Sequence, residues 1–266
     1  MDDKIIKRRE NDRKFRENIF QSNVITQTFL PFTRIESDIF CLILSTLEKD
    51  CLTYNLEIKQ IMKTLNIGRT NYKYIIKGIE GLYEKSLHIS TETTTKKIRF
   101  LSMIEYDKVL TEGEGYLRIE ICLSIVPYLF NLKNNFSVFS LSNYLKLKWT
   151  ISKKIYQLFS QYKKIGRLQI TIEDFQKILG VNYKDTPKFL YSIKKHIDII
   201  QDTTNIENIR IVKVKKGKRI ESLVIYFRWM ERQLELNYTP TTLQMDIKTT
   251  KLYQTLIDDF NQTPTN

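Results

Sequence analysis

The sequence has little of what marks a collagen-like, turn-dominated or disulfide-bonded protein. Only 8 glycines and 5 prolines occur among its 266 residues, which argues against collagen-like repeats and against a fold built mainly from tight turns. The three cysteines, Cys41, Cys51 and Cys122, are an odd number without C-x-x-C spacing. We therefore expect reduced thiols and a cytoplasmic location. Hydrophobic residues make up 42% and charged residues 27% of the chain, a balance that excludes a disordered polymer.

Neither a membrane span nor a secretion signal is evident. The N-terminal stretch, MDDKIIKRREN, carries charges of both signs and lacks the apolar segment of a signal peptide. The densest apolar run, IFCLILSTL at residues 39–47, is too short to cross a bilayer and is typical of a buried helix. The sequence thus predicts a protein without membrane contact.

Signals for catalysis are also missing. No glycine belongs to a GxxxxGK[ST] motif, so we do not expect ATP hydrolysis. His88 and His196 are the only histidines and lie far apart in the chain, so the paired-histidine metal site of a DNA-nicking enzyme is absent. No Cys/His spacing suits zinc, and no tyrosine has the context of a DNA-cleaving nucleophile. We expect a protein that is not an enzyme and that uses no metal or cofactor.

Positive charge is concentrated in one part of the chain. Lys and Arg number 43 against 30 Asp and Glu, which gives a net charge of +13 and a pI near 9.4. Residues 136–229 hold 19 basic and 7 acidic residues, whereas residues 1–135 hold 21 and 18. A genome-wide preference for lysine would raise the lysine content everywhere, and the first half does not show this excess. The concentration predicts a dedicated surface for a polyanion, with nucleic acid as the partner.

A repeat at an offset of 114 residues links the two halves of the chain. Residues 54–67 (YNLEIKQIMKTLNI) and 168–181 (LQITIEDFQKILGV) share apolar positions at helical spacing. The matched pairs are Leu56 with Ile170, Ile58 with Ile172, Ile61 with Phe175, Leu65 with Leu179 and Ile67 with Val181. The repeat predicts two copies of one fold.

Helices are expected on both sides of each copy. An amphipathic helix precedes the first copy at 34–48, where Thr33 and Glu36 form a capping box, and another precedes the second copy at 153–164. A further helix follows each copy. Its expected N-cap is Thr70 in the first half. In the second half it is Thr186, with Pro187 at the first helical position.

Each half then changes to the period of a β-strand. Alternating β-branched and aromatic residues around short polar turns predict hairpins within 86–122 and 206–229. The order of helix, short strand, helix, turn, helix and hairpin is that of a winged helix. The sequence therefore predicts an α+β protein with two tandem winged-helix domains.

This pattern divides the chain into four parts. A segment near 123–150 joins the winged helices, and the polar tail is expected to be peripheral, with a short helix at 251–260. The parts are an N-terminal arm of basic and acidic residues at 1–18, a first domain at 19–135, a second domain at 136–236 and a C-terminal tail at 237–266.

The second winged helix carries the stronger signals for DNA binding. A winged helix places the N-terminal residues of its recognition helix at base edges in the major groove. Lys188 with Tyr191 or Ser192 is expected to touch bases, and the neighbouring lysines to touch phosphates. Lysines at the start of the preceding helix oppose its macrodipole, which suggests a role in phosphate binding. The predicted contacts are Lys184, Thr186, Lys188, Tyr191, Ser192, Lys194 and Lys195 on the recognition helix, Lys213, Lys215, Lys216, Lys218 and Arg219 on the wing, and Lys148, Lys153 and Lys154 before them.

The first winged helix carries a weaker set of the same kind. Its basic residues are diluted by Glu80 and Glu84, so the surface is expected to make either a lighter DNA contact or a protein interface. The candidate residues are Arg69, Thr70, Asn71, Lys73, Tyr74 and Lys77 on the helix, and Lys96, Lys97 and Arg99 on the expected wing.

These features together resemble the iteron-binding plasmid replication initiators, whose members have two tandem winged-helix domains. The resemblance covers roughly residues 20–230 and includes Pro-Tyr-Leu at 127–129, Tyr-Gln-Leu-Phe at 156–159 and Leu-Gly-Val at 179–181. One departure is Lys-Ile-Tyr at 154–156, where the family usually has Arg-Leu-Tyr. A cation is retained there, but the bidentate geometry of arginine is lost.

The resemblance implies a function in the bacterial cytoplasm. Monomers would bind direct repeats of double-stranded DNA at a plasmid origin, help to open it, and recruit host replication proteins such as a helicase or an initiator. Dimers, in equilibrium with monomers, would bind an inverted repeat and repress the initiator's own gene. The second domain would supply the main sequence recognition and the first would supply dimerisation and auxiliary DNA contact.

Two other readings of the same residues stay open. The first alternative is a transcription regulator with tandem winged helices and no replication role, and direct repeats beside the gene would favour the initiator over it. A rolling-circle nickase would need a metal site and a cleaving tyrosine, neither of which the sequence supports.

Overall fold

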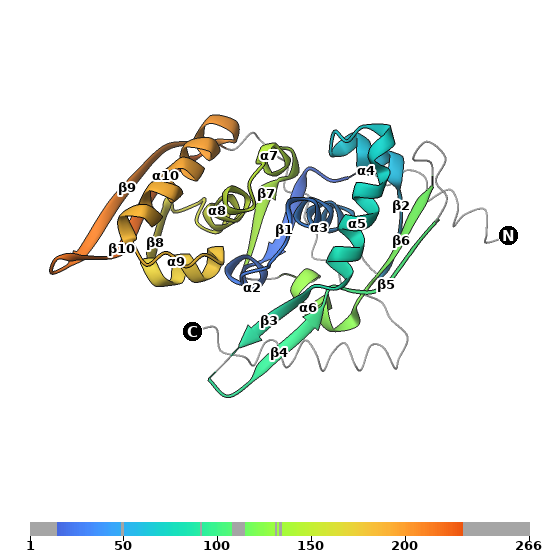
Figure 1. Ribbon diagram of the computed structural model, residues 1–266, viewed down its shortest axis with the longest axis horizontal. Helices are drawn as coiled ribbons and strands as arrows, with labels where there is room; N and C mark the ends of the chain where they lie inside the picture. The colour runs from blue at the N-terminus through green and yellow to red at the C-terminus, as the bar shows by residue number, and fades with distance from the viewer. Residues whose placement is uncertain are drawn as a thin grey trace.

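The computed structural model describes residues 15–48, 51–90, 92–107, 115–130, 132 and 135–230. Most of the predicted N-terminal arm, the tail at 237–266 and its expected helix lie outside these residues. The described residues form two winged helices that share a contiguous hydrophobic core (Figure 1). Within them, no helix is both long and apolar enough to cross a membrane.

The first winged helix has a three-stranded antiparallel sheet in the order β2-β6-β5, and a separate hairpin of β3 and β4. Helix α5 packs against both α3 and strand β5. The elements are β1 (Asn18–Ser22), α2 (Asn23–Gln27), α3 (Arg34–Thr46), β2 (Thr53–Glu57), α4 (Ile58–Thr64), the 3-10 turn η1 (Arg69–Asn71), α5 (Tyr72–Tyr83), β3 (Ser86–Ser90), β4 (Thr95–Arg99), β5 (Leu101–Tyr106) and β6 (Tyr116–Ile121).

The second winged helix has a three-stranded antiparallel sheet in the order β8-β10-β9. Short elements η2 (Leu123–Ile125) and α6 (Val126–Leu129) lead into it. Its elements are β7 (Phe136–Ser140), α7 (Leu141–Lys146), α8 (Thr150–Gln161), β8 (Arg167–Thr171), α9 (Ile172–Leu179), α10 (Thr186–Thr203), β9 (Ile206–Lys216) and β10 (Arg219–Trp229). The segment near 123–150 is therefore not a plain linker, because it supplies β7 and α7.

The repeat predicted from the sequence is present in the structure. Elements β2, α4 and α5 begin at residues 53, 58 and 72, and β8, α9 and α10 begin at residues 167, 172 and 186. Each pair of starts differs by the 114 residues seen in the sequence. The α+β class and the winged-helix fold are confirmed.

The two copies meet through equivalent strands. Strand β1 opens the first copy, β7 opens the second, and the two pair antiparallel with Phe20 opposite Val138 at the centre of the register. Ser22 and Ser140 end these strands, and each caps the short helix that follows, α2 or α7. Because each strand belongs to a different copy, their pairing joins the winged helices by backbone hydrogen bonds.

Helix α3 begins as the sequence predicts and is buried almost throughout. The Thr33 hydroxyl accepts from the Glu36 N–H at 3.4 Å, and the Glu36 carboxylate accepts from the Thr33 N–H at 2.8 Å, which completes the capping box. The helix packs against α5 on one side and α7 on the other. A helix with both flanks covered has few solvent-facing positions, which explains the apolar run at residues 39–47.

The two other predicted N-caps are wrong. Asp185, not Thr186, caps α10, because its carboxylate accepts from the Lys188 N–H. In the first copy, residues around Thr70 form the 3-10 turn η1, so α5 begins only at Tyr72. Hydroxyl and carboxylate side chains are both good caps, so the choice between neighbouring candidates depends on the path of the preceding turn.

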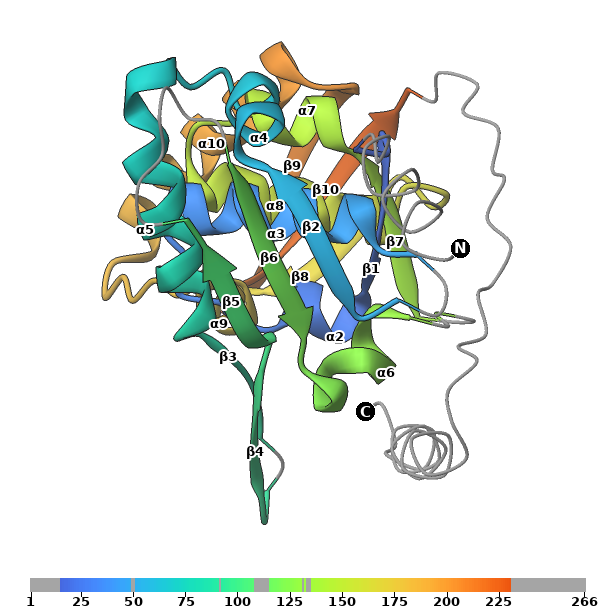
Figure 2. The same ribbon diagram turned by 90° about the vertical axis from the view of Figure 1, so that its right-hand side faces the viewer.

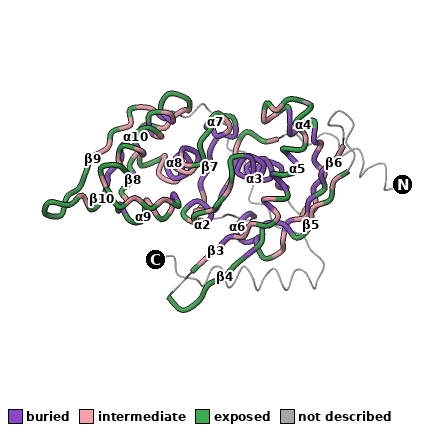
Figure 3. Tube along the Cα trace, in the orientation of Figure 1, coloured by how far each residue is buried: buried purple, intermediate pink, exposed green. Residues whose placement is uncertain are grey.

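The recognition helices of both copies lie on one side of the molecule. Figure 2 shows α5 and the start of α10 toward the left, with β1 and β7 on the right. The hairpin β9–β10 projects from the second copy, and β3–β4 projects from the first (Figure 1). Figure 3 shows that both projections are largely exposed toward their tips, whereas α3 is buried.

Candidate nucleic-acid interface

Helices α9 and α10 form the helix-turn-helix of the second copy. Thr171 caps α9, and Gly180 ends it with φ of +66°, a left-handed conformation that suits glycine. Helix α10 then buries one stripe at Phe189, Ile193 and Ile197. This packing leaves the opposite face of α10 to solvent.

The exposed face of α10 is basic and includes one large aromatic side chain. Tyr191 is 65% exposed, and the Lys195 ammonium lies 4.6 Å from the centre of its ring. The Lys188 ammonium lies 4.0 Å from the Asp185 carboxylate, in an exposed pair that holds the lysine only weakly. Ser192 is half-buried, and its hydroxyl accepts from Tyr183 at 3.2 Å. The exposed predicted residues are Lys184, Lys188, Tyr191, Lys194 and Lys195, while Thr186 is half-buried.

The wing of the second copy is a long hairpin with a basic tip. Strands β9 and β10 pair Lys216 with Arg219 across a turn in which Gly217 has φ of +62°. No other part of the described chain lies near this glycine, so the tip projects into solvent. One of the cations is partly neutralised, because Lys216 lies 3.5 Å from Glu221. The exposed cations of the wing are Lys213, Lys215, Lys216, Lys218 and Arg219.

The recognition helix is held against α8 by a polar contact as well as by its apolar stripe. The Ser152 hydroxyl and His196 Nδ1 are 2.9 Å apart, and Ser152 is fully buried. Burial lowers the pKa of His196 below its ordinary value. His196 therefore helps to position α10 on the domain core.

The prediction that Lys153 binds phosphate is wrong, and Lys154 is not free either. Lys153 is 1% exposed, and its ammonium bonds the Asp38 carboxylate of α3 at 2.6 Å and the Tyr144 carbonyl oxygen at 2.9 Å. The Lys154 ammonium donates to the carbonyl oxygens of Ile25 at 3.1 Å and Thr28 at 2.6 Å. Both lysines fasten α8 to the first winged helix, whereas Lys148 is exposed.

The first copy presents a smaller and less basic face on α5. Tyr74 is 47% exposed, and Thr70 and Asn71 lie in the turn before the helix together with Arg69. The helix has 12 residues, against 18 in α10. The exposed predicted residues are Thr70, Asn71, Lys73, Tyr74 and Lys77.

The predicted wing of the first copy is a different hairpin. Lys96, Lys97 and Arg99 lie on β4, which pairs only with β3 and does not join the β2-β6-β5 sheet. The topological counterpart of the second wing is instead β5–β6, whose tip lies outside the described residues. Arg99 also lies 3.9 Å from Glu84 and stacks over Tyr83. Lys96 and Lys97 remain exposed on the extra hairpin.

The structure has a cationic cluster on the outer face of the second sheet that the sequence analysis does not predict. Arg167 and Arg210 each lie over the ring of Tyr226, with 5.9 Å and 5.0 Å to its centre. The three residues come from three strands that are paired in register. Period-two alternation marks Tyr226 as facing away from the core, but only the strand register brings the two arginines to it.

Fold and site together define a tandem winged-helix protein with a basic recognition helix and wing in its second copy. The chain belongs to the initiator replication protein family, because the family model described as Initiator Replication protein, WH1, matches residues 18–160. This match begins at β1 and ends inside α8, so it includes the strand pair that joins the two copies. No curated protein matches the chain significantly.

A solved structure of an initiator protein shows the same fold at low sequence identity. A crystal structure of the Pi initiator protein in complex with iteron DNA matches with a TM-score of 0.70 and 18% identity, covering 82% of this chain and 99% of that chain. Domains 2 and 3 of RctB match with a TM-score of 0.41 and 11% identity, covering 82% of this chain and 92% of that chain. The first match shows that this chain and that protein share one overall fold.

Proposed function

We propose that this initiator binds direct repeats in the double-stranded origin DNA of a plasmid, chiefly through α10 and the β9–β10 wing. The observation that carries the proposal is the exposed basic surface of the second copy, formed by α10 and a projecting hairpin. Membership of the initiator replication family supports the replication role. The Pi initiator, which has this fold, was crystallised with iteron DNA.

The geometry suggests how the duplex is read. The first turns of α10 enter the major groove, where Lys188 and Tyr191 meet base edges. Lys194 and Lys195, farther along the helix, neutralise phosphates. The tip of the wing, centred on Gly217, holds the backbone beside the groove. Binding therefore releases several counterions and weakens steeply as salt is raised.

The first copy adds a second and lighter contact to the same duplex. Helix α5 lies on the same side of the molecule as α10 (Figure 2), so one duplex along that side meets both helices. Lys73, Tyr74 and Lys77 are exposed there. The face has fewer cations than α10, which favours positioning over sequence reading.

Further steps follow from the family resemblance. We propose that bound monomers open the origin and recruit host replication proteins, and that dimers joined through the first copy repress the initiator's own gene. The protein acts by binding rather than by catalysis, in the bacterial cytoplasm. Incubation with supercoiled origin DNA and Mg²⁺ or Mn²⁺ tests the last point, since nicked or relaxed product would overturn it.

Fluorescence anisotropy tests the DNA-binding proposal. One labelled duplex carries direct repeats from the DNA that flanks the gene, and a second has the same bases shuffled. We expect tight binding to the repeats and at least tenfold weaker binding to the shuffled duplex at 0.1–0.2 M salt, as for specific sites in general. Equal binding to both duplexes would contradict the proposal.

A further inference from the structure

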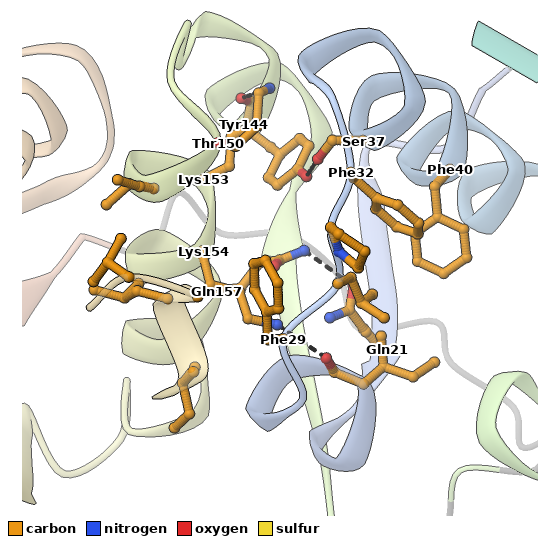
Figure 4. Close-up of a pocket in the computed structure, with 18 residues that line it drawn as sticks. Gln21, Phe29, Phe32, Ser37, Phe40, Tyr144, Thr150, Lys153, Lys154 and Gln157 are labelled. Atoms are coloured by element: carbon orange, nitrogen blue, oxygen red, sulfur yellow. Dashed lines mark hydrogen bonds between the residues drawn. The ribbon is translucent and has the colours of Figure 1, made fainter. Parts of the chain in front are cut away.

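A cavity of about 270 Å³ lies between the two winged helices. Figure 4 shows Phe32 and Phe40 of the first copy on one side and Lys154 and Gln157 of α8 on the other, with Phe29 between them. Residues 178–181, at the end of α9, close another side. Aromatic and aliphatic walls with a few polar groups at one end are the usual lining of a small-molecule site.

The two adjacent lysines beside the cavity differ in how their charges are balanced. Lys153 forms an ion pair with Asp38. Lys154 has only two neutral partners, the carbonyl oxygens of Ile25 and Thr28, and no carboxylate of the described residues pairs with it. An ammonium has three N–H donors, so one donor of Lys154 has no partner within the part of the chain that the structure describes. Burial without a counter-ion lowers the pKa of Lys154 to about 7.

We propose that this cavity binds a small organic acid, with its apolar body against the phenylalanines and its carboxylate against Lys154. The anion supplies the counter-charge that Lys154 lacks, and the apolar body is removed from water by the aromatic wall. Lys153 does not compete for the anion, because its charge is already balanced by Asp38. The acid is a ligand of the folded protein and takes part in no reaction.

The ligand would touch both copies of the winged helix at once. Gln157 of α8 donates to Gln21 of β1 at 3.1 Å, and the hydroxyls of Ser37 and Tyr144 are 2.5 Å apart; all four residues line the cavity. The ring of Phe29 lies directly against Gly180, where a Cβ atom would be 1.9 Å from a ring carbon. A ligand held between these groups stabilises the arrangement in which the copies are joined.

The proposal also implies that binding takes up a proton. Of the residues that line the cavity, Tyr144, Lys153 and Lys154 are titratable, and Asp38 lies beside them in its pair with Lys153. A carboxylate next to Lys154 raises the pKa of that lysine. Above pH 7, where much of the free protein has Lys154 neutral, binding must add a proton to it, and affinity falls as the pH rises.

Calorimetric titration of the full chain with 2-naphthoate tests the proposal. We expect one site per chain, and at least tenfold weaker binding of 2-naphthol, which has the same rings without the carboxylate. K154M should weaken naphthoate binding at least tenfold. K164M serves as the matched control, because Lys164 is an exposed lysine just after the same helix, and it should leave the affinity unchanged. Absence of binding, or equal affinity in a folded K154M variant, would overturn the proposal.

If K154M does not fold, titrations of the wild-type protein alone test the proposal. Titrations at pH 7.5 in two buffers of different ionisation enthalpy report the protons exchanged on binding. Net proton uptake, with affinity falling from pH 6.5 to pH 8.5, supports a carboxylate against Lys154. Binding with no proton uptake and no change of affinity over that range would contradict it.

Discussion

The two winged helices share one order of elements but differ in surface. Residues 1–135 have nearly balanced charge, with 21 basic and 18 acidic residues, whereas residues 136–229 have 19 and 7. Helix α10 is half again as long as α5, and the strands of the second wing have 11 residues each, against 6 in β5 and β6. The repeated apolar positions specify the same fold in both copies. The surface residues are not needed for that fold, and it is in these residues that the two copies differ.

Two lysines of the second half, Lys153 and Lys154, lie at the joint between the copies and bind groups of the first copy. Lys153 and Lys154 have the residue type expected of a DNA contact, but their side chains end on groups of the first copy. Burial disfavours the charged forms of both side chains, so it raises the pKa of Asp38 and lowers the pKa of Lys153. Their mutual attraction offsets this cost of desolvation. Basic residues in the second half therefore fall into two sets. Lys153 and Lys154 lie at the joint between the copies, and the exposed lysines of α10 and the wing are the ones that we propose contact the duplex.

The largest effect is expected at the joint. K153M removes the ammonium that lies 2.6 Å from the buried Asp38 carboxylate and leaves it the Arg34 guanidinium at 3.7 Å. The free energy of unfolding should fall by up to about 3–5 kcal/mol. Urea unfolding followed by circular dichroism measures the change. K148M removes an exposed lysine just before the same helix and should change stability by less than about 0.5 kcal/mol. A K153M effect as small as that of K148M would show that the joint does not depend on this pair.

The next largest effect is expected on DNA affinity, and it should differ between the two projecting hairpins, β9–β10 and β3–β4. Replacing Lys215, Lys216 and Lys218 with Ala removes up to three phosphate contacts. It should weaken binding to every duplex roughly 100-fold at 0.1 M salt and reduce the salt slope by about 2–3. The matched triple variant of Lys96, Lys97 and Arg99 should have a much smaller effect. Anisotropy across a salt series compares them, and equal losses would remove the distinction between the hairpins.

The smallest effect concerns the two histidines. The pKa of His196 is lowered in the folded protein, so the unfolded chain binds its proton first as the pH falls. Stability from this group is present above the ordinary pKa of histidine and is lost as the pH drops below it. H196Q should therefore reduce the fall in melting temperature between pH 7 and pH 5. H88Q, at an exposed strand position of the first copy, should not change it.

Much of the fold could be predicted because its signals are local. The capping box at Thr33 needs only residues three apart, and the 114-residue repeat needs only a comparison of apolar spacing. The exposed lysines of α10 follow from the stripe of Phe189, Ile193 and Ile197 on the same helix. In each case the deciding residues lie within one element or within one copy.

The errors occur where the deciding partner is distant in sequence. Asp38 lies 115 residues from Lys153, so no local pattern marks that lysine as buried. Lys96 and Lys97 lie in a hairpin of the predicted kind, but the hairpin that serves as the wing must join the sheet of β2. The hairpin that does so is β5–β6, in which β6 pairs with β2. The periodicity of a single segment gives no information about which distant segment it pairs with.

One comparison of matched variants tests most directly whether the second copy reads the sequence and the first does not. K188A/Y191A changes α10, and K73A/Y74A changes the corresponding face of α5. Anisotropy on the repeat duplex and its shuffled control gives the selectivity of each variant. We predict that K188A/Y191A loses about 1–3 kcal/mol of discrimination per base contact removed, while K73A/Y74A keeps the wild-type ratio. Equal loss in both, or loss only in K73A/Y74A, would contradict this division of roles.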